Sequence, residues 1–462
     1  MKRSLPGGEQ RECAVSSLAI VGGRMIDPAN GIDAVVDVVV VDGLVARVGA
    51  EAASEIDVDR TIEAGGKVVT PGFVDLHVHL REPGQEHKET ILSGARAAAA
   101  GGFTTICALP NTDPAIDNAG LVEAELQAAR EAVVRVLAVG CVTKGRGGAE
   151  LAPIGELARS GVVALSDDGD FVANAAVMRK ALEYASMFDL VIAQHCEEPE
   201  LVAGGQMHEG WVSARLGLAG RPSSAEVSAV ARDLGLAEEL GARLHIQHVS
   251  TTRAVELVAE AKSRGVRVTA EVTPHHLTLT HEAVAFGAAR DEGDELLYET
   301  NAKVNPPLRE EADVAACVEG LRSGVIDCVA TDHAPHASHE KAVEFDQAPP
   351  GLIGLETAFG LCMRAVEAGE LELATLVERM SIGAVRAWDL DARDGLAGLG
   401  SLGLGAPGDV VILDPASAWT VDAESIQSLS RNTPLLGQSL TGRVLVTVAG
   451  GEVVFEAPGV VA

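Results

Sequence analysis

Short apolar runs alternate with alanine-rich helical stretches through the middle of the 462-residue chain, and this alternation restricts the possible folds most. Each run has the length and the valine and isoleucine content of a buried strand, and a helix or a long loop follows it. Eight such runs fit a closed (β/α)₈ barrel of the TIM type better than an open sheet. The eight predicted strands are residues 68–80, 104–109, 136–142, 162–166, 190–195, 244–249, 266–273 and 326–331.

Both ends of the chain have a different, strand-rich pattern. Asp42-Gly43 separates two valine-rich runs, and this dipeptide supplies the positive φ angles of a tight hairpin turn. Residues 409–413 and 444–455 repeat the pattern near the other end. The predicted α/β chain therefore has a disordered lead at 1–15, a small β-sandwich domain from 16–69 and 386–462, and a metal-dependent catalytic barrel at 70–385.

Composition limits the partners. The chain has 67 acidic and 36 basic residues, so its formal net charge of −31 repels nucleic acid. A locally basic pocket can still take an anionic metabolite. No apolar run reaches the roughly 18 residues of a membrane span, and the first residues lack the apolar region of a signal peptide. The seven cysteines are scattered and form no CxxC pair, which argues against a disulfide framework. We therefore predict a cytoplasmic protein with neither a nucleic-acid nor a membrane partner.

Polar residues follow several apolar runs, at the strand ends where barrel enzymes build their active sites. His77 and His79 are two residues apart, so they share one face of their predicted strand. His245 lies on the opposite face from His248, and we predict that it packs between strand and helix. The other strand ends carry Asp167 and Asp168, His195, His248 and Asp332.

Each of these motifs is ambiguous alone. Two histidines in an HxH pair can be packed core residues, and two acids before a glycine usually form a turn. Their convergence on one barrel mouth instead indicates a metal centre, because neutral imidazole and carboxylate are ligands that zinc prefers. Four histidines and a shared aspartate supply enough ligands for two metals.

A series of longer motifs strengthens this interpretation. The strings DLHVHLREPG, GGFTT, PNTDPAIDN, SDDG, HCE, HVS, EVTPHH, NPPLR and TDHAPH occur in this order. The series resembles the class I dihydroorotases, which belong to the cyclic amidohydrolases of the amidohydrolase superfamily. The resemblance extends from about residue 23 to residue 455. It implies a barrel capped by a small β-sandwich, two zinc ions per chain and a small-molecule substrate.

The resemblance also implies roles for single residues. It implies that His77 and His79 bind the first metal, that His195 and His248 bind the second, and that Asp168 bridges both. Asp332 is implied as the general acid and base. The family commonly has phenylalanine before the pocket glycine, whereas this chain has proline. The residues implied to contact the substrate are His79, Arg81, Asn111, Asn305, Asp332, His336, Pro350 and Gly351.

The implied reaction is the reversible conversion of L-dihydroorotate to N-carbamoyl-L-aspartate in de novo pyrimidine (UMP) biosynthesis. A zinc-bound hydroxide is a nucleophile at neutral pH, and Arg81 can hold a substrate carboxylate through two parallel hydrogen bonds. Another cyclic amidohydrolase, such as an allantoinase or a dihydropyrimidinase (hydantoinase), is an alternative. Those enzymes typically bridge their metals with a modified lysine, whereas this chain has Asp168. An inactive scaffold partner of aspartate carbamoyltransferase is a second alternative, although such a homologue should have lost its metal ligands.

Some features are assigned no direct role. Lys144 lies in a glycine-rich turn and is predicted to be solvated rather than a modified metal bridge. The segment 281–299 is long and acidic, and it has no functional interpretation. Family habit suggests a homo-oligomer, and association with aspartate carbamoyltransferase is left open. His275 and His276 are predicted to orient metal ligands, and the histidines predicted to lie at the surface are His87, His208, His281 and His339.

Overall fold

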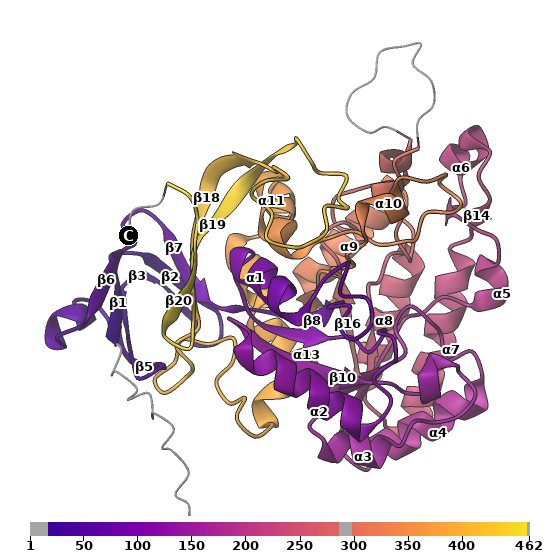
Figure 1. Cartoon of the computed structure of the whole chain (residues 1–462), viewed down its shortest axis with the longest axis horizontal. Helices are drawn as coiled ribbons and strands as arrows, with labels where there is room; N and C mark the ends of the chain where they lie inside the picture. The colour runs from indigo at the N-terminus through magenta and orange to yellow at the C-terminus, as the bar shows by residue number, and fades with distance from the viewer. Residues whose placement is uncertain (1–16, 286–297, 460–462) are drawn as a thin grey trace, which may run out of the picture.

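The computed structural model describes residues 17–285 and 298–459, so the predicted lead at 1–15 and most of the acidic segment 281–299 lie outside the described residues. Two sheets built from the terminal segments lie on one side of a barrel that is surrounded by helices (Figure 1). None of the helices in the described part of the chain is long and apolar enough to cross a membrane.

Eight parallel strands form the barrel, as predicted. Their order in the sheet is β17-β16-β15-β12-β11-β10-β9-β8. A parallel bridge between Val78 and His333 joins the two edges, and the amide of His79 donates to the carbonyl of His333 at 2.9 Å, so the sheet closes on itself. The strands are β8 (Phe73–Val78), β9 (Phe103–Ala108), β10 (Arg135–Gly140), β11 (Ala164–Ser166), β12 (Val191–Gln194), β15 (Leu244–Ile246), β16 (Val268–Val272) and β17 (Cys328–Val329).

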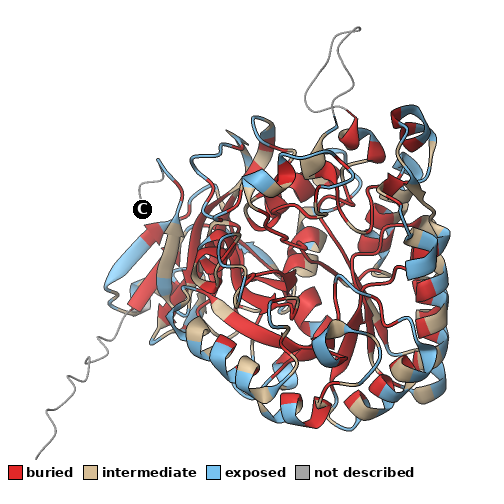
Figure 2. Cartoon of the chain, turned by 45° about the vertical axis from the view of Figure 1, so that its right-hand side comes forward, coloured by how far each residue is buried: buried red, intermediate tan, exposed pale blue. Residues whose placement is uncertain are grey.

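Helices follow the strands because the helical stretches place small apolar residues on their inner faces, and four of them begin at a residue whose side chain caps the first turn. The side chain of Thr90 accepts the amide of Ser93 at the start of α1, and Asn118, Asn174 and Thr251 cap other helices in the same way. Figure 2 shows buried strands enclosed by helices with exposed outer faces. The main helices are α1 (Ile91–Ala100), α2 (Ala119–Ala128), α3 (Ile154–Arg159), α4 (Ala175–Ser186), α7 (Ser224–Leu240), α8 (Thr252–Ser263), α9 (Glu311–Ser323), α11 (Ala358–Glu367), α12 (Leu373–Met380) and α13 (Ile382–Trp388), with shorter ones at α5 (Pro199–Val202), α6 (Trp211–Leu216) and α10 (Ser338–Lys341).

The terminal segments form a four-stranded sheet, β5-β4-β1-β6, and a six-stranded sheet, β20-β19-β18-β7-β2-β3. Apolar residues of both chain ends, among them Ile20, Val40, Val410 and Val446, form one core between the sheets. The prediction of a β-sandwich built from both termini is thus confirmed. The strands are β1 (Ser17–Val21), β2 (Arg24–Asp27), β3 (Ile32–Val35), β4 (Asp37–Val41), β5 (Leu44–Gly49), β6 (Arg60–Glu63), β7 (Val68–Pro71), β18 (Val410–Thr420), β19 (Ser439–Ala449) and β20 (Glu452–Glu456).

The prediction of a single strand over residues 68–80 is wrong. The chain forms two strands there, because β7 pairs with β18 and β2, whereas β8 pairs with β9 in the barrel. Gly72 separates the two. A Cβ at this position would lie 2.1 Å from the hydroxyl oxygen of Thr104, so only glycine lets the chain pass so close to the neighbouring strand.

Candidate metal centre and substrate pocket

The carboxyl ends of five barrel strands bring the predicted ligands together. His77 lies in β8 and His79 directly follows it, and the other ligands follow β11, β12 and β15. Asp332 follows β17 by three residues. All six side chains are buried, which is the placement that an active site at the carboxyl end of a barrel requires. These residues are His77, His79, Asp168, His195, His248 and Asp332.

The first group of ligand atoms consists of His77, His79, Asp168 and Asp332, and their ligand atoms lie within 4.8 Å of one another. One carboxylate oxygen of Asp168, Oδ2, lies 3.2 Å from His77 Nε2 and 3.3 Å from His79 Nε2. Asp332 Oδ1 lies 2.9 Å from the same His79 nitrogen. Asp332, predicted as the proton carrier and as a substrate contact, is therefore also close enough to be a ligand.

The second group consists of Asp168, His195 and His248. Here the other oxygen of Asp168, Oδ1, lies 3.6 Å from His195 Nδ1 and 3.4 Å from His248 Nε2. The two imidazole nitrogens are 2.9 Å apart. Asp168 thus presents one oxygen to each pair of histidines, which is the geometry of a bridging carboxylate.

Unsatisfied atoms test whether these groups suit a cation. Among the described residues, His77 Nε2 and Asp168 Oδ1 are buried and have no hydrogen-bond partner. A buried polar atom without a partner costs about 1–3 kcal/mol, so such atoms indicate that something else binds there. Imidazole nitrogens and carboxylate oxygens converging on two points fit divalent metals.

Hydrogen bonds on the far side of three imidazoles set their tautomers. Glu271 accepts from His77 Nδ1 at 2.5 Å, Asn111 Oδ1 accepts from His79 Nδ1 at 2.7 Å, and Glu197 accepts from His195 Nε2 at 3.2 Å. In each ring the nitrogen that faces Asp168 keeps its lone pair for a metal. The outer contacts therefore prepare the inner nitrogens as ligands.

Glu271 was not predicted as a functional residue. It lies inside β16, and its second oxygen accepts from His245 Nε2 at 3.0 Å. Burial raises the pKa of Glu271, but the neighbouring His77 and the hydrogen bonds from both histidines outweigh burial and lower it to about 2. A carboxylate within an apolar run is a local sign of a buried polar contact, but it does not identify the two histidines as the partners. His245 is buried, and its ring packs edge-on against Trp388 of α13, with the centroids 5.7 Å apart.

Strained backbone coincides with the site. Arg81, His248 and Asp332 have φ angles of 61°, 33° and 47°. Positive φ costs a residue with a side chain about 1–2 kcal/mol. The surrounding structure therefore holds three predicted site residues in conformations that an unconstrained chain avoids.

Arg81 lies beside the first group of ligand atoms and brings a positive charge into the pocket. Its side chain is buried, and its Nε donates to the carbonyl of Pro335 at 3.2 Å. This is the only hydrogen bond of its guanidinium within the described residues. Burial lowers the pKa of Arg81 to about 10, so the group stays charged at neutral pH and can bind an anion.

Two predicted substrate contacts have a buried acceptor without a hydrogen-bond partner in the described part of the chain, Asn305 Oδ1 and His336 Nδ1, and the latter lies 3.9 Å from Glu340 Oε2. His336 Nε2 donates to the carbonyl of Pro350 at 2.9 Å, so Nδ1 keeps its lone pair. Burial and the charge of Arg81 lower the pKa of His336 to about 2, and the ring is therefore neutral. The pocket combines one cation with acceptors for ligand N–H groups.

The Pro350-Gly351 turn forms one wall of this pocket. Gly351 has a φ of 133°, and a Cβ there would lie 2.7 Å from Ala334 Cβ and 3.0 Å from His336 Nε2. Only glycine fits. The departure from the family pattern at Pro350 leaves the contact with His336 intact, because the main-chain carbonyl makes it.

Two of the predicted surface histidines are buried. His208 and His281 pack ring against ring and lie close to Glu310, whereas His87 and His339 are exposed. Arg309 donates to His208 Nδ1 at 3.3 Å. Because Nδ1 accepts this hydrogen bond, the proton of the neutral His208 ring lies on Nε2. The cluster of His208, His281 and Glu310 is therefore a poor metal site. The prediction failed because His208 lies in a strand of only two residues, β13 (Met207–His208), and His281 begins a short 3-10 helix, so neither has a long apolar pattern around it.

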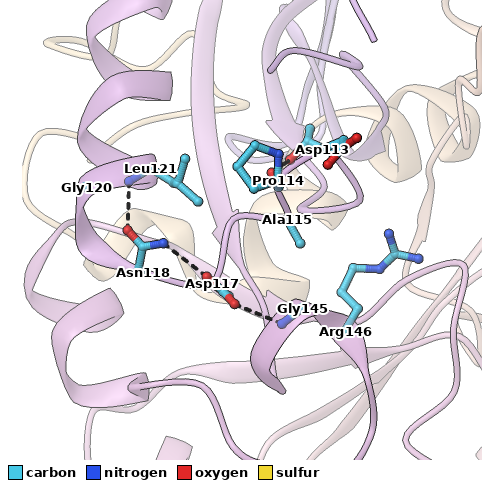
Figure 3. Close-up of a pocket in the computed structure, with 10 residues that line it drawn as sticks. Asp113, Pro114, Ala115, Asp117, Asn118, Gly120, Leu121, Gly145 and Arg146 are labelled. Atoms are coloured by element: carbon cyan, nitrogen blue, oxygen red, sulfur yellow. Dashed lines mark hydrogen bonds between the residues drawn. The ribbon is translucent and has the colours of Figure 1, made fainter. Parts of the chain in front are cut away.

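The glycine-rich turn forms one side of a surface hollow of about 660 Å³, next to the loop that carries Asn111. In Figure 3, Asp117 accepts from the amide of Gly145 and from the side chain of Asn118, which stabilises the turn. None of the predicted site residues lines the hollow. Lys144 of the same turn is exposed and pairs with Glu150, as expected for a solvated lysine.

Comparisons with known proteins identify the family of the chain. A model of the family described as dihydro-orotase-like matches residues 66–254. The chain is 51% identical over 440 residues to a dihydroorotase of Anaeromyxobacter dehalogenans, covering 95% of this chain and 98% of that protein. It is 48% identical to a dihydroorotase of Trichlorobacter lovleyi, with 95% and 99% covered. Among solved structures, the L-hydantoinase (dihydropyrimidinase) from Arthrobacter aurescens superposes with a TM-score of 0.84 at 26% identity, over 97% of this chain and 98% of that one. On the strength of the identity and coverage of these relatives, the chain belongs to the dihydroorotase family of cyclic amidohydrolases.

Proposed function

We propose that the chain is a dihydroorotase, which interconverts L-dihydroorotate and N-carbamoyl-L-aspartate in de novo pyrimidine biosynthesis. Its relatives at about half identity over almost their whole length carry this name. The observation that carries the proposal is the position of Arg81, a buried cation beside a centre of histidines bridged by Asp168. A buried cation favours a substrate ring that bears a carboxylate.

The proposed cofactor is a pair of zinc ions. His77 and His79 would hold one ion, His195 and His248 the other, and Asp168 both. When bound, zinc polarises a carbonyl and lowers the pKa of water, which supplies the Lewis acidity and the nucleophile for amide hydrolysis. The outer contacts from Glu271, Asn111 and Glu197 would fix the ligand nitrogens in the required tautomer.

Asp332 is the proposed carrier of the proton. Burial raises the pKa of Asp332, but His77 and His79 beside it outweigh burial and lower it, so the carboxylate is ionised at neutral pH and ready to accept a proton. In hydrolysis, Asp332 takes the proton from the attacking water and delivers it to the ring nitrogen that leaves the carbonyl. In cyclisation the same carboxylate returns the proton along the reverse path.

The remaining pocket residues orient the substrate in this proposal. Arg81 binds the carboxylate through its two terminal nitrogens. Asn305 Oδ1 and His336 Nδ1 accept ring N–H groups, which would satisfy both unpartnered acceptors. Asn111 uses Oδ1 for His79, so its amide nitrogen is left for the substrate.

A hydantoinase or dihydropyrimidinase is the competing reading, because solved structures with those names share the fold. Fold alone does not distinguish the substrates. Two activities, that of a dihydroorotase and that of a hydantoinase or dihydropyrimidinase, can be distinguished by rate measurements on protein of known zinc content. The substrates are dihydroorotate, dihydrouracil, hydantoin and allantoin. We expect turnover of dihydroorotate and about two zinc equivalents per chain. Preference for an uncharged ring would overturn the proposed substrate, and absence of turnover in zinc-loaded protein would favour a scaffold.

Arg81→Lys tests the carboxylate contact. Lysine keeps the charge but loses the planar fork, so we expect kcat/KM for dihydroorotate to fall by about tenfold or more. Hydrolysis of an uncharged ring, if any is detectable in the wild type, should change far less. Equal losses on both kinds of substrate would contradict the assigned role.

Family membership also supports a homo-oligomer in the cytoplasm, with aspartate carbamoyltransferase as a candidate partner. Mass measurement of the purified chain, alone and mixed with the carbamoyltransferase, tests both associations. A monomeric mass at micromolar concentration would overturn the first.

A further inference from the structure

The segment between β18 and β19, residues 421–438, leaves the six-stranded sheet and extends across the barrel; we call it the strap. In Figure 1 it is the yellow trace that runs from the top of β18 and β19 past α11. The strap lies far from the site residues in sequence, and no motif of the sequence analysis includes it. Its contacts nevertheless lead to the substrate pocket.

Two carboxylates of the barrel fix the middle of the strap. Glu89 accepts from the hydroxyl of Ser428 and from the amide of Leu429 at 3.1 Å. Glu356 accepts from the amide of Gln427 at 2.9 Å and from the amide of Ser428 at 3.1 Å. Hydrogen bonds to charged groups are stronger than neutral ones. Burial raises the pKa of Glu356 to about 7, whereas the contact with His333 outweighs burial and lowers the pKa of Glu89, so the charged Glu89 docks the strap most firmly.

Asn432 extends from the docked strap to both turns of the pocket. Its Nδ2 donates to the carbonyl of Ala334 at 2.9 Å and to the carbonyl of Gly351 at 3.0 Å. Its Oδ1 accepts from the amide of His336 at 3.0 Å. The side chain is buried. One amide therefore joins the turn that follows β17 to the Pro350-Gly351 turn.

The opposite side of the Pro350-Gly351 turn is held from within the barrel. The amide of Gly351 donates to the carbonyl of Lys303 at 2.8 Å, and Lys341 Nζ donates to the carbonyl of Pro349 at 2.7 Å. Asn432 closes the other side. These contacts require the side-chain amide of Asn432, because both of its N–H donors and its oxygen acceptor make hydrogen bonds. An aspartate would offer no donor.

We infer that Asn432 is a positioning residue for the substrate pocket, which sets the spacing of its two turns and thereby aims His336 Nδ1 at the substrate. The inference rests on the proposed function, since it assigns His336 to the substrate. The hydrogen bond from His336 Nε2 to Pro350 completes the link between the turns. The terminal β-sheets thus contribute one residue to a pocket that the barrel otherwise builds.

Asn432→Asp tests the inference, because it keeps the size of the side chain but places an oxygen against two carbonyls. We expect KM for dihydroorotate to rise about tenfold or more while kcat changes less than about threefold. Zinc content should stay near wild type, whereas the unfolding midpoint should fall, because a buried oxygen that faces two carbonyls is destabilising. Ser430→Ala is the matched control, because Ser430 donates from the same strap to the carbonyl of Lys88 at 2.7 Å and does not contact the pocket turns. Its KM should stay within about twofold of wild type.

A double-mutant cycle with Asn432→Ala and His336→Ala gives a second test that does not depend on the aspartate variant. If Asn432 acts through His336, the double variant should lose no more than the worse single variant. Additive losses, a wild-type KM in Asn432→Asp, loss of zinc, or an equal effect of Ser430→Ala would overturn the inference. Wild-type protein without activity on dihydroorotate would instead overturn the proposed function itself.

Discussion

At the scale of single residues, Asp168 connects the two pairs of histidines through its two oxygens. Asp168→Ala should therefore lower the zinc content from about two equivalents to nearly none. His195→Ala removes a ligand from the second group alone, so about one equivalent should remain. Metal analysis of the purified variants, with circular dichroism as a control for folding, measures the difference. Equal zinc loss in both variants would contradict a bridging role.

Asp332 is ionised and within 2.9 Å of His79, so it can carry a proton next to the metal ligands. Asp332→Asn keeps the shape but removes the base. Turnover of dihydroorotate should fall by roughly a hundredfold or more, while zinc content stays at the wild-type value. Steady-state rates and metal analysis on the same preparation decide the role. Loss of zinc in this variant would place Asp332 among the ligands instead.

Asp233 shows how a buried acid affects stability. Burial raises the pKa of Asp233 to about 6, although hydrogen bonds from Arg232 and Gln194 oppose the shift. The unfolded chain loses this proton near the ordinary value of 3.8. Between these values the folded state binds more protons than the unfolded state, so stability falls as pH rises and levels off above about 6.

Asp233→Asn removes the titrating group. The stability of the variant relative to wild type should therefore increase by about 2–3 kcal/mol between pH 4 and pH 6. It should then stay constant at higher pH. Urea unfolding of both proteins at matched pH values measures this difference. A difference that does not change with pH would show that Asp233 is ionised in the folded state throughout.

At the scale of elements, strand ends were predictable and contacts between distant segments were not. The eight barrel strands were predicted, and so was the meeting of the candidate ligands at their ends, because buried parallel strands are short apolar runs and their carboxyl ends carry the polar residues. The division at Gly72 was missed, since β7 and β8 are both apolar and only their partners differ.

The missed residues have a common physical reason. Glu271 is a carboxylate within an apolar strand. Its role depends on which histidines it contacts in the folded barrel. Asn432 lies in a segment without periodicity, and its partners Gly351 and Ala334 are 81 and 98 positions away. His208 and His281 are buried by contacts with each other and with Trp211 and Arg309, which lie elsewhere in the chain. Local pattern contains none of this information.

At the scale of the whole molecule, the net charge of −31 opposes the approach of an anionic substrate. Salt screens this long-range field but affects the buried Arg81 much less. We therefore expect kcat/KM for dihydroorotate to rise about twofold to threefold between roughly 10 mM and 150 mM ionic strength. Initial rates at low substrate concentration measure the effect. An uncharged osmolyte at the same osmolality as the salt is the control. A steady decrease with salt would mean that the local field of the pocket governs association.

In the six-stranded sheet, β7 lies between β2 and β18. The ribosome synthesises β2 early and β18 near the end of the chain. While the ribosome is still translating the chain, β7 has an open edge on the β18 side. The strap with Asn432 is also missing until the last tenth or so of the chain has been made. A nascent chain can therefore assemble the barrel strands and the residues of the candidate metal centre before its substrate pocket is finished. A product truncated before residue 421 keeps those residues but lacks β19, the strap and Asn432.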